Sequence, residues 1–266
     1  GAVNDAVKKL ALSRQEQEIA LELFHERGLI IHLTATETLR NIVIIKPQWL
    51  IDALGKVIRD STIHVDISEF DRVGLEEDAN VLFDKGIASR DILEYLWDHD
   101  QTEFFIDLMK RTMLMSAYPE NRFLIPSLLK DNTEMTFDKS CTIDFSESFL
   151  PNGLFQRLVC LCVEYVSRKS ATEKASMSKH HASFSDFAGQ EVELLEDPNR
   201  QAILFSCSDI DAVIPIINSM LLKINSNVLG GRLKWKVLID GKKFQSEKAL
   251  EIQSPTLDID VFLESL

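Results

Sequence analysis

The stretch Asn41-Ile-Val-Ile-Ile-Lys-Pro-Gln-Trp-Leu50 runs from a hydrophobic segment through Pro47 into a second apolar element. Two later stretches repeat this design, Arg122-Phe-Leu-Ile-Pro-Ser-Leu-Leu129 and Ser148-Phe-Leu-Pro-Asn-Gly-Leu-Phe-Gln-Arg-Leu158. Proline suits such a junction because its φ angle already matches a helix's first turn, where its missing N–H is not needed. Each junction therefore predicts an extended segment that ends at a proline and is followed by an apolar element.

The first half of the chain is predicted to be mostly helical. Ser13, with Glu16 three residues later, forms a capping-box pattern and predicts that a helix begins there. Apolar runs over residues 29–33 and 42–45 predict two short strands, the second of which leads into Pro47. A helix, a strand, a loop, a strand and a helix in this order are typical of a winged-helix unit.

The same order recurs before Pro126. Two helical patterns follow Ser89 and lead into apolar runs over residues 112–115 and 123–125, which predict a second hairpin. We therefore predict two winged-helix-like units in tandem over residues 1–140.

The second half changes to mixed patterning. Residues 141–145 alternate between apolar and polar as a strand does, and residues 151–165 form a long apolar helix pattern. Further strands and one helix are predicted over residues 181–187, 192–195, 202–207, 210–223 and 232–240. The fold class is thus predicted to be α+β, with a helical first subdomain (1–140) and an α/β second subdomain (141–266).

Large apolar side chains mark the expected core. Trp49, Trp97, Phe155 and Trp235 are each expected to be largely buried. The helix over residues 151–165 carries more apolar side chains than one face can bury. We expect either that the sheet and the first subdomain cover it on both sides, or that one side binds another chain.

The balance of charge limits the classes of partner. The chain has 266 residues, 45% of them hydrophobic, and a formal net charge of −13 at pH 7. Residues 1–150 hold 16 Lys and Arg against 27 Asp and Glu, which leaves −11 there. Such a surface repels phosphate backbones and anionic membranes. No apolar run approaches the roughly 20 residues of a membrane span, so we expect neither nucleic-acid binding nor membrane insertion.

Motifs for catalysis or for cofactor binding are missing from the sequence. It contains no G-x-x-x-x-G-K-[ST] loop for a nucleotide, and Cys160 and Cys162 lie two apart, which is not a zinc-binding spacing. We expect the cysteines to be reduced, buried thiols, and we predict no catalytic residue, cofactor or metal ligand. His180 and His181, upstream of Cys207, leave a cysteine hydrolase as an open alternative.

In their order and spacing, the proline junctions resemble the COR domain (C-terminal of Roc) of Roco proteins. The resemblance rests on a Pro-x-Trp-Leu helix at Pro47, an Ile-Pro-Ser-Leu-Leu ending at Pro126 and a Pro-x-Gly-Leu-Phe-x-Arg-Leu helix at Pro151. It implies a COR-A-like subdomain over residues 1–140 and a COR-B-like subdomain over residues 141–266.

The resemblance also implies a function. A COR domain is a non-catalytic module that scaffolds and regulates a Roc GTPase domain of the same polypeptide and takes part in dimerisation. A cytoplasmic signalling protein with a Roc domain in cis and a homodimer partner is therefore expected. Winged helices often bind DNA, so a winged-helix nucleic-acid-binding module is the alternative, although the predicted helix over residues 48–59 has only Lys56 and Arg59 as basic residues.

One stretch departs from the family pattern. Many members carry a Trp-Arg-x-Gly strand early in the second half, whereas the corresponding stretch here is Lys179-His-His-Ala-Ser-Phe-Ser-Asp-Phe187. The resemblance places a dimer or Roc contact on this subdomain, and the candidate interface residues are His180, His181, Phe184 and Phe187. We expect His180 and both phenylalanines to be exposed, and the isolated chain to be a monomer or a weak dimer.

Overall fold

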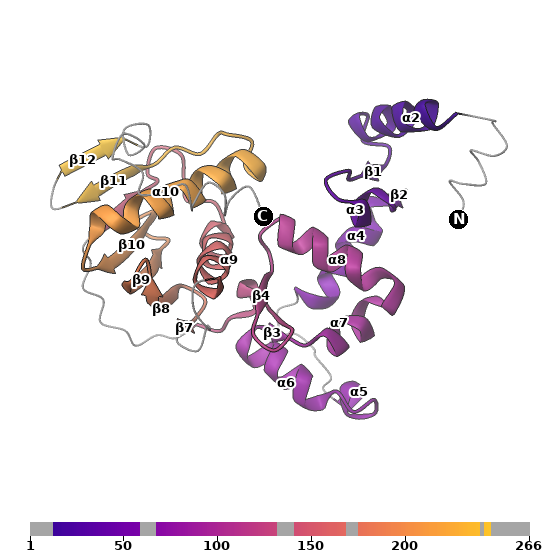
Figure 1. Ribbon diagram of the computed structural model, residues 1–266, viewed down its shortest axis with the longest axis horizontal. Helices are drawn as coiled ribbons and strands as arrows, with labels where there is room; N and C mark the ends of the chain where they lie inside the picture. The colour runs from indigo at the N-terminus through magenta and orange to yellow at the C-terminus, as the bar shows by residue number, and fades with distance from the viewer. Residues whose placement is uncertain (1–12, 59–67, 132–140, 169–174, 240–241, 246–266) are drawn as a thin grey trace. The chain divides into compact units, whose positions relative to one another are not determined.

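The computed structural model of the chain describes residues 13–58, 68–131, 141–168, 175–239 and 242–245. Its helices and three antiparallel sheets, shown in Figure 1, confirm the predicted α+β fold class. The chain divides into two compact units, one made of residues 1–59 and 93–108 and the other of residues 60–92 and 109–266.

The first unit is mainly helical. Its elements are α2 (Arg14–Glu26), β1 (Ile31–His32), α3 (Glu37–Arg40), β2 (Val43–Ile44) and α4 (Pro47–Val57), together with residues 93–108 from α7 (Arg90–Trp97) and α8 (His99–Arg111). The predicted capping box is present at the start of α2, where the hydroxyl of Ser13 accepts a hydrogen bond from the backbone N–H of Glu16. Pro47 is the first residue of α4, as predicted.

Aromatic rings hold the core of this unit. Trp97 is buried, its indole Nε1 donates a hydrogen bond to the carbonyl oxygen of Ala53 at 2.8 Å, and its ring lies 5.0 Å from that of Phe105. Trp49 also packs on Phe105, at 5.2 Å between ring centroids. The expected burial is therefore confirmed for Trp97. Trp49, on the first turn of α4, is only half-buried, so the expectation that it is largely buried was wrong.

The second unit contains the two larger sheets. Its earlier elements are α5 (Ser68–Asp71), α6 (Glu76–Lys85), β3 (Ile87–Ala88), β4 (Ser116–Tyr118), β5 (Arg122–Leu124) and the 3-10 turn η1 (Pro126–Leu128). Its later elements are β6 (Cys141–Asp144), α9 (Leu154–Ser167), β7 (Ala175–Met177), β8 (His181–Phe187), β9 (Gln190–Asp197), β10 (Ala202–Cys207), α10 (Ile210–Asn227), β11 (Lys236–Ile239) and β12 (Lys242–Gln245).

Both predicted hairpins form and each leads into a proline, but the first strand of the second hairpin is Ser116–Tyr118, whereas the predicted residues 112–115 lie in the turn before it. β1 pairs with β2 before Pro47, and β4 pairs with β5 before Pro126, the first residue of η1. β3 joins β5 as a third strand, which the local sequence pattern did not indicate. The winged-helix assignment stays a prediction, as does the division after residue 140, although no sheet of the described residues crosses that point.

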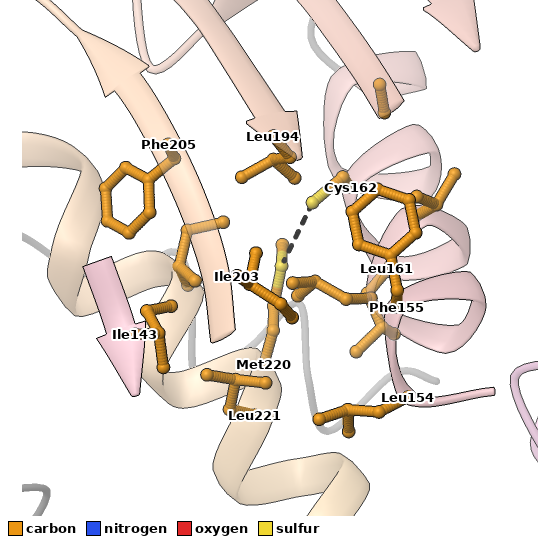
Figure 2. Packing of buried hydrophobic residues seen from close by; sticks show 14 of the residues in the cluster. Ile143, Leu154, Phe155, Leu161, Cys162, Leu194, Ile203, Phe205, Met220 and Leu221 are labelled. Carbon is orange, nitrogen blue, oxygen red and sulfur yellow. Dashed lines mark hydrogen bonds between the residues drawn. The ribbon is translucent and has the colours of Figure 1, made fainter. Parts of the chain in front are cut away.

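Seven antiparallel strands form the large sheet, in the order β12-β11-β6-β10-β9-β8-β7. Alternate side chains such as Ile143, Leu194 and Phe205 line one face and share a hydrophobic cluster with α9 and α10. Figure 2 shows this cluster, in which the sulfur atoms of Cys162 on α9 and Met220 on α10 lie 3.9 Å apart. The second half is therefore a sheet whose core face is packed against two helices.

Helix α9 is buried on nearly every side within this unit. Ten of its residues are buried, from Leu154 to Val166, including the predicted anchor Phe155. It contacts β8 of the large sheet, the helix α10, and β4 and η1 from the earlier part of the chain. We expected either that the sheet and the first subdomain cover this helix or that one side binds another chain. The first of these is what the fold shows, so the apolar surface of α9 needs no second chain.

Candidate functional site

The turn between β6 and α9 is held at both of its ends. Phe145 and Leu150 are buried and anchor it in the core. Between them, the hydroxyl of Ser148 donates to the carbonyl oxygen of Lys234 at 2.6 Å and accepts from the Lys234 N–H at 3.0 Å. The backbone N–H of Leu150 donates to Oε1 of Gln201 at 2.7 Å. These bonds fix the backbone on either side of residue 149.

Phe149, at the centre of this turn, points into solvent. Its side chain is 77% exposed, the largest value among the exposed large hydrophobic residues of the described chain. Its φ angle is +65°, in the left-handed region, where a bulky residue is rare and the conformation costs roughly 1–2 kcal/mol. The fold therefore holds a strained backbone at a residue whose aromatic ring is largely exposed.

Charged residues occur on the segments that hold this turn. Glu147 pairs with Lys236 of β11, and Lys234, whose backbone is bonded to Ser148, is exposed. Arg232 is exposed nearby in sequence. An exposed aromatic side chain on a backbone fixed by hydrogen bonds is typical of a protein-interaction hot spot, because the backbone needs no further ordering on binding. We call Phe149 and the residues that hold it, Phe145 to Leu150, the Phe149 turn.

The structure changes the predicted interface at His180, His181, Phe184 and Phe187. Phe184 and Phe187 lie in the hydrophobic cluster under the sheet, and the Phe187 ring lies 4.9 Å from that of Tyr165. The expected exposure of both phenylalanines is therefore wrong. The sheet pairing shifts register between them, and this irregularity turns both rings, three residues apart, towards the same core.

The two histidines have separate environments. His180 is partly exposed, and its Nδ1 lies 2.8 Å from a carboxylate oxygen of the largely buried Glu196. His181 is buried, and its Nε2 has no hydrogen-bond partner among the described residues. Burial lowers the pKa of His181, and the carboxylate of Glu193 acts in the opposite direction. A role of His180 in an interface stays a prediction.

The cysteine hydrolase alternative lacks a matching geometry. Cys207 stands opposite Val192 on β9, whereas His181 stands opposite Leu195, three positions further along that strand. Three positions separate the two residues by about 10 Å along the sheet, well beyond hydrogen-bond reach.

In the described parts of the chain, no three His, Cys, Asp or Glu side chains gather as metal ligands. The helices placed in the structure include none with the length and apolar character needed to cross a bilayer. The exposed aromatic turn thus remains the feature with the clearest built geometry in the second unit.

A comparison with known families identifies the N-terminal half. Residues 2–129 match the family described as C-terminal of Roc, COR-A domain. This part of the chain is a COR-A domain. The match contains two of the three proline junctions, at Pro47 and Pro126, and ends directly after η1. The COR-A region therefore supplies β4 and η1, which cover one side of α9.

Sequence reasoning missed the Phe149 turn, which lies beyond the COR-A match. The tract Ser148–Leu158 was noted only for its proline junction, and Phe149 was read as part of a hydrophobic segment. One signal was available, because Phe149 and Leu150 are neighbours and an extended segment can turn only one of them inward. The sequence could not show which of the two faces the core.

Proposed function

We propose that the chain is the COR module of a Roco-type protein and that it scaffolds and regulates a Roc GTPase domain of the same polypeptide. The COR-A match over residues 2–129 supports this assignment. The module would itself be non-catalytic, and the parent protein would act in cytoplasmic signalling. We further propose that the Phe149 turn is the part of the second unit that contacts the Roc domain.

The exposed ring of Phe149 carries this proposal. An aromatic side chain that is 77% exposed on a hydrogen-bonded turn offers a large apolar area to a partner, and the backbone that carries it needs no further ordering. The strained φ angle adds to the argument, because strain of this kind persists where a function requires it. A partner pocket that encloses the ring would complete the contact.

The test is a binding measurement between this chain and the Roc domain of its parent protein, by calorimetry with the Roc domain loaded with GDP or with a GTP analogue. Phe149→Ala is expected to weaken binding at least about 30-fold, the effect of a hot-spot residue worth 2 kcal/mol. Ile51→Ala, which truncates another exposed apolar side chain on α4, serves as the matched control and should leave affinity unchanged. Equal affinities for wild type and Phe149→Ala would place the Roc contact elsewhere.

Dimerisation is proposed as a property of the assembled Roc–COR protein rather than of this chain alone. The full burial of α9 within one chain supports this view, because it removes the apolar surface that could have driven self-association. Light scattering should find the isolated chain as a monomer at micromolar concentration and the Roc–COR protein as a dimer. A tight dimer of the isolated chain would show that the interface is self-sufficient.

A further inference from the structure

Helix α2 has an amphipathic sequence but no buried residue. Ile19, Leu23 and Phe24 are 65%, 47% and 45% exposed, and Leu29 just after the helix is 62% exposed. At 100° per residue, Ile19, Leu23 and Phe24 fall on one continuous side of the helix. In Figure 1, α2 lies apart from α7 and α8 of the same unit. The described fold thus leaves the apolar face of α2 largely accessible, from 45% exposed at Phe24 to 65% at Ile19.

Both ends of α2 are nevertheless completed by local bonds. At the start, Ser13 and Glu16 form the capping box. At the end, Gly28 has a φ angle of +68°, and the Leu29 N–H donates to the Phe24 carbonyl oxygen at 2.9 Å, which is a Schellman closure. These caps define the helix length, but a 13-residue helix is marginal in water without packing of its apolar face. A partner surface would supply that packing.

A row of glutamates borders the apolar face. Glu18, Glu22 and Glu26 are four residues apart, so they line up on one side of α2, and all three are exposed. With four glutamates and one arginine, the helix carries a charge of −3. We call the apolar side chains of Ile19, Leu23 and Phe24 and this glutamate row the α2 face.

The charge pattern selects the kind of partner. Amphipathic helices that lie on membranes carry Lys and Arg on their polar side, whereas the glutamates of α2 would be repelled by anionic lipid. A second copy of α2 would bring a like-charged glutamate row to the contact, and juxtaposed like charges are costly. A complementary surface is apolar at its centre and bordered by Lys or Arg.

We propose that α2 is a docking helix for a partner protein that offers an apolar groove bordered by basic side chains. The α2 face would lie in that groove with Leu23 and Phe24 as anchors and with the glutamate row against the basic border, the arrangement of helix-in-groove recognition. This inference rests on the first unit and does not depend on the role of the Phe149 turn.

The probes are two synthetic amphipathic peptides that share one leucine face and differ only at its borders, which are lysine in one and glutamate in the other. Binding to the full 266-residue chain is measured by fluorescence anisotropy at low and at high salt. The lysine-bordered peptide should bind at least about 10-fold more tightly than the glutamate-bordered one, with an advantage that shrinks at high salt as charges are screened. Hydrogen exchange should show new protection of the α2 amides.

Variants of the chain make the test specific. Leu23→Ala combined with Phe24→Ala should weaken binding of the lysine-bordered peptide at least about 10-fold. The same double variant should leave the thermal unfolding temperature unchanged, because neither residue is buried. Glu22→Lys combined with Glu26→Lys should reverse the preference between the two peptides. The matched control is Glu76→Lys combined with Glu77→Lys at the exposed start of α6. It changes the net charge of the chain by the same amount and should leave the preference for the lysine-bordered peptide unreversed.

Four results would overturn the proposal. The first is that neither peptide binds, and the second is that the lysine-bordered peptide is still preferred after Glu22 and Glu26 are changed to lysine. The third is that the chain binds phosphatidylserine vesicles and loses this binding in the Leu23 and Phe24 variant. The fourth is that the chain self-associates and that this self-association is lost in the same variant. The last two would assign the α2 face to a membrane or to a second copy of the chain. Reversed preference together with α2 protection would support a basic-bordered partner groove.

Discussion

The indole Nε1 of Trp235 donates a hydrogen bond to Oδ1 of Asn218 at 2.9 Å, and both side chains are buried. The bond joins the segment before β11 to the middle of α10. A tryptophan N–H needs a partner when it is taken out of water. Asn218 is therefore the polar residue that allows the tryptophan to fill this part of the core.

The first prediction concerns this pair. Asn218→Ala should lower the free energy of unfolding by about 1–3 kcal/mol, because it leaves the buried indole N–H without its acceptor. Urea denaturation measures the change. In a Trp235→Phe background, where the donor is gone, the same substitution should cost less by about 1 kcal/mol. Equal costs in the two backgrounds would show that the hydrogen bond does not couple the residues.

The second prediction compares two glycines of the second unit. Gly86 and Gly74 have φ angles of +66° and +74°, so alanine is strained at both. A Cβ at Gly86 would lie 2.9 Å from the Ile125 carbonyl oxygen, whereas a Cβ at Gly74 would meet nothing within 4 Å. Gly74→Ala should cost about 1 kcal/mol, and Gly86→Ala at least about 1 kcal/mol more because of the backbone clash. Chemical denaturation of both variants checks the difference, and equal losses would count against the clash.

The third prediction separates stability from binding at Phe149. Glycine adopts a φ angle of +65° without strain, so Phe149→Gly should raise the free energy of unfolding by about 0.5–1 kcal/mol after the entropy cost of glycine in the unfolded chain. Phe149→Ala keeps the strain and should be close to neutral. A thermal shift assay on both variants gives the answer. Marked destabilisation by either change would mean that the ring packs inside the fold.

The fourth prediction concerns pH. Burial lowers the pKa of His181 in the folded chain, whereas in the unfolded chain this histidine titrates near 6.5. Below about pH 6.5 the unfolded state therefore binds the proton first, and stability is complete above that pH and falls as the pH drops towards the folded-state pKa. His181→Gln should flatten this loss between pH 7 and pH 5 in urea titrations. An unchanged slope in His181→Gln would show that another group causes the loss.

Local sequence rules were sufficient for many elements of this fold. The Ser13 capping box and the prolines at the starts of α4 and η1 depend on residues close in the chain. The motifs around Pro47 and Pro126 also indicated the COR resemblance, which the COR-A match over residues 2–129 confirms. These features follow from backbone geometry and short-range periodicity, and so the sequence by itself determined them.

Only the tertiary structure decided which apolar faces are covered. The sequences of α2 and α9 both carry an apolar face, yet α9 is enclosed by β8, α10, β4 and η1 whereas α2 has no buried residue. The same holds for Phe184, which is buried, and Phe149, which is displayed. Periodicity tells which side chains share a face, whereas burial depends on contacts between segments far apart in the chain, and those contacts form only when the whole fold has assembled.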